Sequence, residues 1–189
     1  MTTQITSREE VVDTLMQVFR DHGYDGTSLS ILSEATGLGR SSLYHYFPNG
    51  KADMGAAVLA RAGEFVREHV VGPLKAAGAP RERVERFALG LDRFYMGGSN
   101  ACLTNVFAIG EAADLFGDKL QERLRLLIAT LANVAQEDGQ SPADAARHAE
   151  DVVIAFQGAL VVSHALRTTD TFRRILSELP DRLLRQAAD

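Results

Sequence analysis

The sequence predicts an all-α protein, with an N-terminal three-helix unit that contains a helix-turn-helix and a C-terminal helical bundle. Apolar residues recur at helical spacing along most of the chain, and no long stretch alternates as a strand would. Hydrophobic residues make up 46% of the 189 residues, which supplies a core and argues against disorder. Two short helical segments within residues 28–47 are joined by a glycine-containing turn, as in a helix-turn-helix.

Capping residues, glycines and prolines mark where each expected helix begins and ends. Ser, Thr and Asp side chains accept from the free amides of a first helical turn, and glycine permits the left-handed conformation that closes many helices. The first expected helices run from Ser7 (a capping box with Glu10) to Gly23, from Thr27 or Ser28 to Gly37, from Arg40 to Phe47, and, after a break at Pro48-Asn49-Gly50, on to Gly72-Pro73. The later ones run from Pro80 to Gly97-Gly98, over 102–113, over 118–137, from Ser141 to Arg167, and from Asp170 onward. The second helix is expected to bury Leu29, Leu32 and Ala35.

Composition narrows the class of protein. The net charge of −5 argues against a surface coated in basic residues, although a local nucleic-acid site is compatible with it. The single cysteine, Cys102, cannot form an internal disulfide, which favours the reducing cytoplasm. The N-terminal MTTQITSREEVV lacks the basic start and apolar run of a leader peptide. No run of about 18 apolar residues is present, so no membrane span or membrane partner is expected.

The most unusual stretch is TGLGRSSLYHYFPNGK, residues 36–51, which crowds hydroxyls and aromatic rings onto one short helix. Tyr44, His45 and Tyr46 point around most of the helix circumference, so a core helix does not explain them. In a helix-turn-helix the second helix enters the major groove of DNA, where Arg40 can bind a guanine edge or a phosphate. The side chains suited to contact DNA are those of Thr27, Ser28, Arg40, Ser41, Ser42, Tyr44, His45, Tyr46 and Lys51.

Other classes of protein stay open from the spacing alone. Residues 28–47 also fit a plain helical hairpin with an aromatic cap, because Arg40 and Lys51 against Glu34 leave residues 28–51 a net charge of only +1. A helical adaptor would use the same surface to bind a protein. An enzyme is disfavoured, since no nucleophile elbow, paired-metal set or glycine-rich phosphate loop occurs. Salt-sensitive binding to duplex DNA separates a DNA-binding protein from both alternatives.

Residues 23–54, GYDGTSLSILSEATGLGRSSLYHYFPNGKADM, resemble the N-terminal DNA-binding segment of the TetR family of transcriptional regulators. The similarity covers the G-x-x-G-T-S-L opening, the A-T-G-L turn, the S-L-Y-H-Y-F helix and the lysine after it. FPNGK, with its extra glycine, and ACLTNVFAIGEAADLF at 101–116 further resemble the branch of LmrA- and YxaF-type drug-responsive repressors.

The resemblance implies a homodimeric repressor that binds a palindromic operator and is released by a small hydrophobic or aromatic inducer. It implies a helix-turn-helix DNA-binding domain over residues 1–50 and a ligand-binding and dimerisation domain over residues 51–189. The groove-facing set it implies is Arg40, Ser41, Ser42, Tyr44 and His45, with Thr27, Ser28, Tyr46 and Lys51 as phosphate anchors. Leu43 and Phe47 are expected to point into the core.

The larger, C-terminal part of the chain offers candidates for a ligand site. Its aromatic side chains first of all form the core, yet a core of six helices with a few polar members often leaves an apolar cleft. The side chains expected to line this cleft are Phe65, Phe94, Cys102, Asn105, Phe107, Phe156 and His164. No basic residue adjoins Cys102 in sequence, which favours an inert thiol over a redox sensor.

Two further patterns concern His164 and the helix that carries it. His164 fits either a core or interface position or a ligand contact, and the five histidines show no paired spacing, so neither a metal site nor a cofactor is expected. The small residues in FQGALVVSHA, 156–165, permit close helix approach. Together with the last helix they predict a four-helix dimer bundle, the alternative being a helix pair within one chain.

Overall fold

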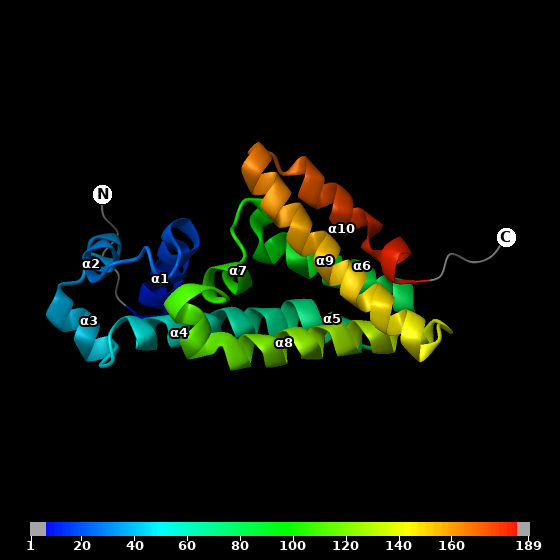
Figure 1. The fold of residues 1–189 in the computed structure, drawn as a ribbon, viewed down its shortest axis with the longest axis horizontal. Coiled ribbons are helices and arrows are strands. Elements are labelled where there is room, and N and C mark those ends of the chain that lie inside the picture. Colours follow the sequence, from blue (N-terminus) through cyan, green and yellow to red (C-terminus); the bar gives the residue numbers. More distant parts are fainter. Residues whose placement is uncertain (1–6, 185–189) are drawn as a thin grey trace. The chain divides into compact units, whose positions relative to one another are not determined.

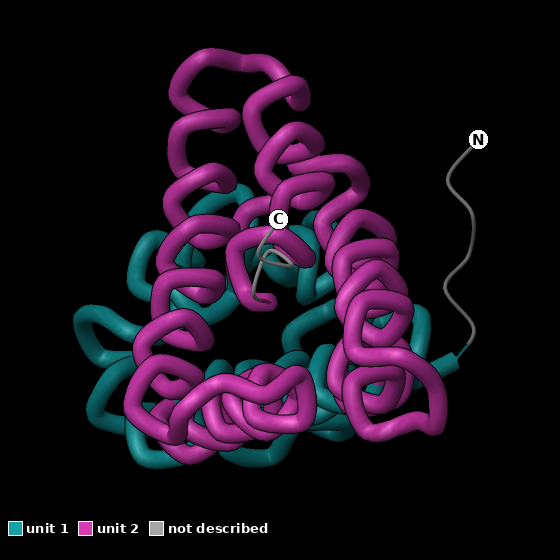
Figure 2. Tube along the Cα trace, turned by 90° about the vertical axis from the view of Figure 1, so that its right-hand side faces the viewer, with its two compact units in different colours: residues 1–64, 103–120 teal, residues 65–102, 121–189 magenta. Residues whose placement is uncertain are grey.

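The computed structural model describes residues 7–184, which form helices joined by turns, with no strand among them (Figure 1). The all-α class is therefore confirmed. The segment before Ser7, where the sequence predicts no leader peptide, lies outside the described residues. The chain divides into two compact units, teal and magenta in Figure 2.

The first unit combines residues up to 64 with residues 103–120. Its helices are α1 (Arg8–His22), α2 (Leu29–Thr36), α3 (Arg40–Tyr46), α4 (Lys51–Phe65, up to residue 64), α7 (Leu103–Phe107) and the first part of α8 (Gly110–Glu137). The predicted capping box is present: Ser7 Oγ accepts from the Glu10 amide, and the Glu10 carboxylate accepts from the Ser7 amide. Arg61 of α4 forms a two-pronged ion pair with Asp13 of α1, with nitrogen–oxygen distances of 3.1 and 3.4 Å.

Four aromatic rings fill the centre of the first unit. Phe19, Tyr24, Phe107 and Phe116 lie with neighbouring centroids 5.4–5.8 Å apart, mostly in tilted or edge-to-face pairs, the arrangement that aromatic quadrupoles favour. An ideal Cβ on Gly55 would lie 3.0–3.1 Å from the rings of Tyr24, Phe107 and Phe116. The missing side chain at Gly55 therefore lets α4 pack directly against this ring cluster.

The second unit combines residues 65–102 with the chain from residue 121 onward. Its helices are η1 (Val66–Val71), a π-helical turn, α5 (Gly72–Lys75), α6 (Pro80–Phe94), the short 3₁₀ turn η2 (Met96–Gly98), the rest of α8, α9 (Pro142–Leu166) and α10 (Asp170–Leu183). Helices α9 and α10 lie side by side (Figure 1). The predicted start of α9 is confirmed, because Ser141 caps it and Pro142 stands in its first turn.

Close approach of α6 to η1 shapes the core of the second unit. An ideal Cβ on Gly90 would lie 2.1 Å from the carbonyl oxygen of His69 and 3.1 Å from the Val70 Cα. Only glycine fits there without a shift of the backbone. Behind this crossing, Phe87 of α6 and Phe156 of α9 meet edge to face, with centroids 6.3 Å apart, in one continuous apolar core.

Three local expectations were wrong. Helical structure continues past Gly72-Pro73 to Lys75, because Pro73 stands in the first turn of α5, where its missing amide costs no hydrogen bond. The segments 102–113 and 118–137 are not separate helices, since the break falls after Phe107 and α8 runs unbroken from Gly110. In α2 the expected Leu32 is buried and Leu29 is half-buried, but Ala35 is exposed. The second buried side chain is instead that of Thr36, whose hydroxyl donates to the Leu32 carbonyl at 2.7 Å.

The compact units do not follow the boundary expected at residue 50. Residues 51–64 and 103–120 pack with the first three helices, so the structural division falls after residues 64, 102 and 120. The division into a DNA-binding part up to residue 50 and a ligand-binding and dimerisation part after it stays a prediction.

Helix α9 is long and apolar enough to cross a membrane by length and composition, with a mean hydropathy of 1.3 over its most apolar 18-residue window. Of that window, 39% is buried inside the protein. The buried side of α9, which includes Val152, Phe156 and Leu160, belongs to the core of the second unit. A core position therefore accounts for one side of the helix, while its other side stays exposed.

Candidate DNA interface and ligand site

The geometry of α2 and α3 follows from their caps and their buried leucines. Ser28 Oγ accepts from the Ile31 amide at 3.3 Å, and Gly37, with φ +69°, closes α2 in the left-handed conformation. Leu32 and Leu43 are fully buried and hold the two helices against the unit. The turn between Gly37 and Arg40 therefore sets the direction in which α3 presents its outer side.

The outer side of α3 carries most of the side chains that the sequence predicts for DNA contact. Leu43 and Phe47 are fully buried, which confirms that they belong to the core. Tyr44 is 45% exposed and Tyr46 36% exposed. The exposed or half-buried set is Ser28, Arg40, Ser41, Ser42, Tyr44, His45 and Tyr46. One face of the first unit thus offers a guanidinium, hydroxyls and an imidazole within two turns of helix.

Neighbouring residues hold several of these side chains in place. Arg40 Nη2 donates to Ser30 Oγ of α2 at 3.0 Å, which directs the guanidinium while leaving the side chain exposed. The Tyr44 ring lies beside Gly50, where an ideal Cβ would be 3.5 Å from it. Asp53 accepts from both the backbone and the side-chain amide of Asn49, which orders the turn after α3. These restraints lower the entropy that the side chains would lose on binding.

Lys51 has a different environment from the one its expected role as a phosphate anchor suggests. Its ammonium lies 3.3 Å from the Tyr24 carbonyl oxygen, 3.5 Å from the Glu111 carboxylate and 4.4 Å from the centroid of the Tyr24 ring. Asp25 Oδ2 accepts from the Glu111 amide at 3.2 Å. The side chain of Lys51 is 22% exposed. Lys51 therefore joins the α1–α2 loop to the start of α8.

The carboxylates near Lys51 also affect Tyr24. Burial, assisted by the negative charges of Glu111 and Asp25, raises the pKa of Tyr24 to about 12. The phenol stays neutral at physiological pH. Sequence reasoning did not identify Tyr24, Asp25 or Glu111, because Glu111 is 86 residues from its partner Asp25 and no local motif connects them.

Thr27 is the predicted DNA-binding residue whose geometry fits the expected role least. Its side chain is buried, its hydroxyl donates to the Gly23 carbonyl, and its amide donates to the Tyr24 carbonyl. Both donors are used inside the first unit. Ser28, in contrast, is exposed and lies at the start of α2.

The structure brings three of the predicted ligand-binding residues into one chain of contacts in the second unit. The half-buried rings of Phe65 and Phe94 stack with centroids 5.5 Å apart, and Phe94 meets Tyr95 edge to face. The Tyr95 hydroxyl lies 3.4 Å from Cys102 Sγ, which is buried. Phe156 is also buried, in the same core.

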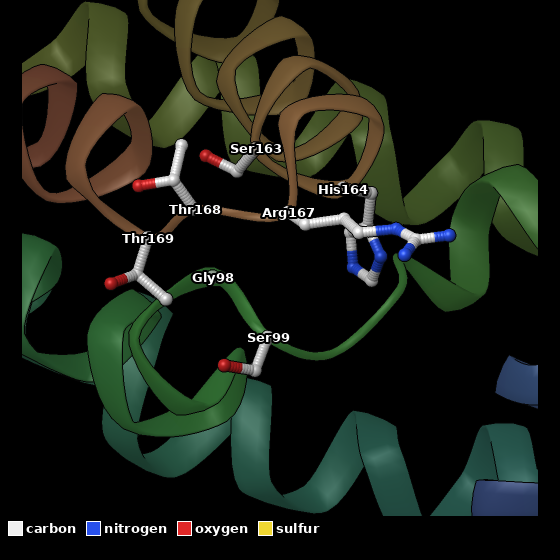
Figure 3. A pocket seen from close by; sticks show the side chains of 7 residues that line it. All are labelled: Gly98, Ser99, Ser163, His164, Arg167, Thr168 and Thr169. Atoms are coloured by element: carbon white, nitrogen blue, oxygen red, sulfur yellow. The ribbon is translucent and has the colours of Figure 1, made fainter.

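The other predicted ligand-binding residues have different surroundings. Phe107 and Asn105 belong to the first unit, where Phe107 is fully buried in the ring cluster and Asn105 is exposed. His164 is exposed and lines an open pocket whose other lining residues are polar or glycine (Figure 3). Phe107 therefore has the environment of a core residue, and His164 that of a polar site.

Comparison with known proteins connects this geometry to a family. Residues 11–58 match the family described as bacterial regulatory proteins, tetR family. The HTH-type transcriptional regulator LmrA of Bacillus subtilis is 24% identical over 183 residues, which cover 95% of this chain and 97% of LmrA. The HTH-type regulator YxaF of the same organism is 30% identical over 87 residues, 46% of this chain and 46% of YxaF, so that match spans about half of each protein.

Solved structures share the fold over nearly the whole chain. A TetR transcriptional regulator from Legionella pneumophila has a TM-score of 0.77 at 16% identity, with 95% of this chain and 98% of that one covered. The TetR-family regulator CifR, solved with a 26-bp double-strand operator DNA, has a TM-score of 0.75 at 18% identity and covers 96% of this chain and 98% of its own.

These relatives are regulators rather than enzymes, and they include the LmrA and YxaF proteins whose branch the motifs predict. The family match falls on α1 to α4, the part of the first unit whose exposed α3 side chains suit the major groove. Together, the family match over residues 11–58 and the similarity to LmrA identify this part of the chain as the helix-turn-helix DNA-binding domain of a TetR-family transcriptional regulator, and the solved structures show that the whole chain shares the fold of such regulators.

Proposed function

We propose that the protein is a homodimeric cytoplasmic repressor that binds a palindromic operator through α3 and leaves it when a small hydrophobic or aromatic inducer binds. Residues 1–50 read the DNA, and residues 51–189 bind the inducer and form the dimer. The observation that carries the proposal is the outer side of α3, where Arg40, Tyr44 and His45 stay exposed while Leu43 and Phe47 fix the helix from behind. The operator complex of CifR, which shares the fold, supports this use of the helix.

The side chains of this face divide into base readers and phosphate anchors. Arg40, held by Ser30, has the planar fork that binds guanine O6 and N7 together. Ser41 and Ser42 are short hydroxyls at the start of α3, where the chain comes nearest to base edges. Tyr46 and Ser28 lie at the ends of α3 and α2 and suit phosphates.

Replacing Arg40 with Ala is expected to cost about 1–3 kcal/mol of operator affinity and to relax preference at one base pair per half-site. Lys51→Ala, if the ammonium binds a phosphate, weakens binding to operator and random DNA alike and lowers the salt slope by about one. Fluorescence anisotropy with operator and scrambled duplexes, at several salt concentrations, measures both effects. Equal losses on both duplexes for Arg40→Ala contradict its role as a reader.

Glu111→Gln is the matched control for Lys51, because it removes the internal ion pair at 3.5 Å and leaves the ammonium in place. A phosphate anchor predicts that Glu111→Gln keeps DNA affinity while Lys51→Ala loses it. Equal losses in the two variants, with equal drops in thermal stability, indicate that Lys51 acts only by joining Tyr24 to α8.

The exposed side of α9 supports a dimer. Ile154 is 62% exposed, Val161 57%, Val162 43% and Leu166 64%, and Gly158 lies between them with open space around it. These positions recur three, four and seven residues apart and so form one apolar stripe along the helix. A second copy of the same stripe, related by a two-fold axis, covers it and brings one α3 from each chain to the DNA.

Introducing a charge into this stripe is expected to break the dimer. Val161→Glu places a carboxylate opposite its symmetry mate or against an apolar surface, so the chain becomes a monomer at micromolar concentration and loses affinity for the full palindrome. Leu89→Glu, at a 58% exposed position on α6, is the matched control. Sedimentation and anisotropy measure the two properties. A Val161→Glu protein that stays dimeric, or a wild type that binds lipid vesicles through α9 in place of dimerising, contradicts the assignment of this face.

For the inducer site, the half-buried pair Phe65 and Phe94 is the strongest support. Both rings pack against the core of the second unit without being enclosed by it, and Phe65 also meets the His69 ring at 4.6 Å. An aromatic ligand can extend this stack. It can change operator affinity only through unequal affinity for the free and DNA-bound conformations, typically by about 5–150-fold.

A further inference from the structure

A pocket in the second unit has a chemistry that the proposed aromatic inducer does not match. It lies where the segment after η2 faces the turn between α9 and α10 (Figure 3). Its volume of about 530 Å³ is in the range of small-molecule sites. The lining residues are Gly98, Ser99, Ser163, His164, Arg167, Thr168 and Thr169. Apart from Gly98, each contributes a hydroxyl, an imidazole or a guanidinium, and none is acidic or large and apolar.

Two of the lining hydroxyls are used as acceptors by the scaffold, which fixes what they can offer to a ligand. Ser163 Oγ accepts from the Phe172 amide at 3.1 Å, and Thr168 Oγ1 accepts from the Asp170 amide at 3.3 Å. A hydroxyl that accepts from a backbone amide keeps its own proton to donate. These contacts join the end of α9 to the start of α10, so the pocket wall presents hydrogen-bond donors from a braced turn.

The basic side chains at the pocket have no acidic partner in the described part of the chain. Arg167 ends α9 in the left-handed conformation, with φ +52°, and its backbone amide donates to the carbonyls of His164 and Ser163. Within residues 7–184, neither the Arg167 guanidinium nor the His164 imidazole pairs with an acidic side chain. The Arg173 guanidinium lies beside the same loop, 2.9 Å from an ideal Cβ on Gly97. Asp170, the nearest acidic residue in sequence, does not line the pocket.

We infer that this pocket binds the phosphate or carboxylate group of a small molecule. The Arg167 guanidinium lies beside the His164 imidazole on one side of the pocket, where its fork can donate to two oxygens of such a group at once (Figure 3). The hydroxyls of Ser99, Thr168 and Thr169 lie on the other side and offer donors to the remainder of the ligand. An apolar aromatic ligand would desolvate these groups without replacing their hydrogen bonds, which disfavours it here. The site is distinct in chemistry from the Phe65–Phe94 stack, and its existence does not depend on DNA binding.

The test titrates the full-length protein, without DNA, with inorganic phosphate or acetate while amide resonances are followed by NMR. Sodium chloride at matched ionic strength is the reference. We expect saturable shifts for residues 97–99 and 163–170 with one or both oxyanions. Tighter binding of phosphate identifies a phosphate-bearing ligand, and tighter binding of acetate a carboxylate.

Arg167→Gly removes the fork while glycine keeps the left-handed backbone at no steric cost. We expect it to weaken oxyanion binding at least about tenfold, as for the loss of a charge-assisted hydrogen bond. Arg93→Gln, an exposed position on α6 of the same unit, removes the same charge and should leave binding unchanged. Shifts that chloride reproduces, or that Arg167→Gly and Arg93→Gln reduce equally, overturn the inference.

Discussion

Phe107→Ala should destabilise the first unit by about 3–5 kcal/mol, the usual cost of removing a fully buried phenylalanine. The Phe107 ring has no exposed surface and meets Phe19, Tyr24 and Phe116 at centroid distances of 5.4–5.5 Å. Its loss opens a cavity beside Gly55, where α4 has no side chain with which to fill it. DNA affinity should fall together with stability, because α3 is held by the same unit.

Chemical denaturation followed by circular dichroism, and DNA anisotropy, measure these two effects. Phe107→Leu is the control that keeps most of the apolar volume and should lose much less. Phe94→Ala, at a half-buried position in the second unit, should spare DNA binding in the absence of ligand. If Phe107→Ala keeps full stability and only loses inducer binding, the sequence-based assignment of Phe107 to the ligand site is correct and its core role is wrong.

Gly90→Ala should cost about 3 kcal/mol or more, at the upper end for overpacking, because the new methyl group meets backbone and not a movable side chain. An ideal Cβ there would lie 2.1 Å from the His69 carbonyl oxygen and 2.9 Å from its carbon. Relief requires α6 to move away from η1. For a protein of this size, a loss of this magnitude lowers the melting temperature by roughly 6–12 °C.

Gly117→Ala is the matched control for the crossing, since Gly117 also lies inside a helix, α8, but has no atom within 4 Å of an ideal Cβ. There the loss of backbone freedom in the unfolded chain dominates, and stability should rise by about 0.5–1 kcal/mol. Differential scanning calorimetry of the two variants gives opposite signs if the close crossing is real. A stable Gly90→Ala protein would show that α6 and η1 are not in this contact.

Local signals in the sequence predicted the helix limits well where one cap decides them. Ser7, Ser28 and Ser141 each accept from the amide three residues further along the helix they cap, a contact encoded within four residues of sequence. The predicted helix limits were wrong where packing against residues distant in sequence decides them. Gly117-Asp118 suggests a break, but one interior glycine costs only about 1 kcal/mol, and the burial of Phe116 and Leu120 on either side outweighs it.

The candidate DNA face was predictable from local sequence in the same way. The contacts that surround Lys51 beside it were not. Exposure of Arg40, Tyr44 and His45 follows from the helical period set by the buried Leu43 and Phe47. The environment of Lys51 depends on Glu111, which approaches only because α8 returns to the first unit. No pattern near residue 51 indicates that return. The polar pocket around Arg167 likewise joins segments about 65 residues apart. Periodicity alone therefore leaves His164 open between a core position and a ligand contact, and it does not indicate the polar surroundings of this residue.

The first unit is assembled from two pieces of chain with residues 65–102 between them. Exchange of DNA-reading modules between relatives therefore cannot follow the contiguous stretch that the family shares, residues 11–58. A graft ending at residue 64 would leave the rings of Phe19 and Tyr24 without Phe107 and Phe116, and Lys51 without Glu111. A recombinant that changes operator choice and still folds has to receive residues 103–120 together with the N-terminal segment. The alternative is to change only the outward side chains of α3. With the role proposed for α3, operator specificity can also change through point substitutions on that one helix, without the exchange of any module.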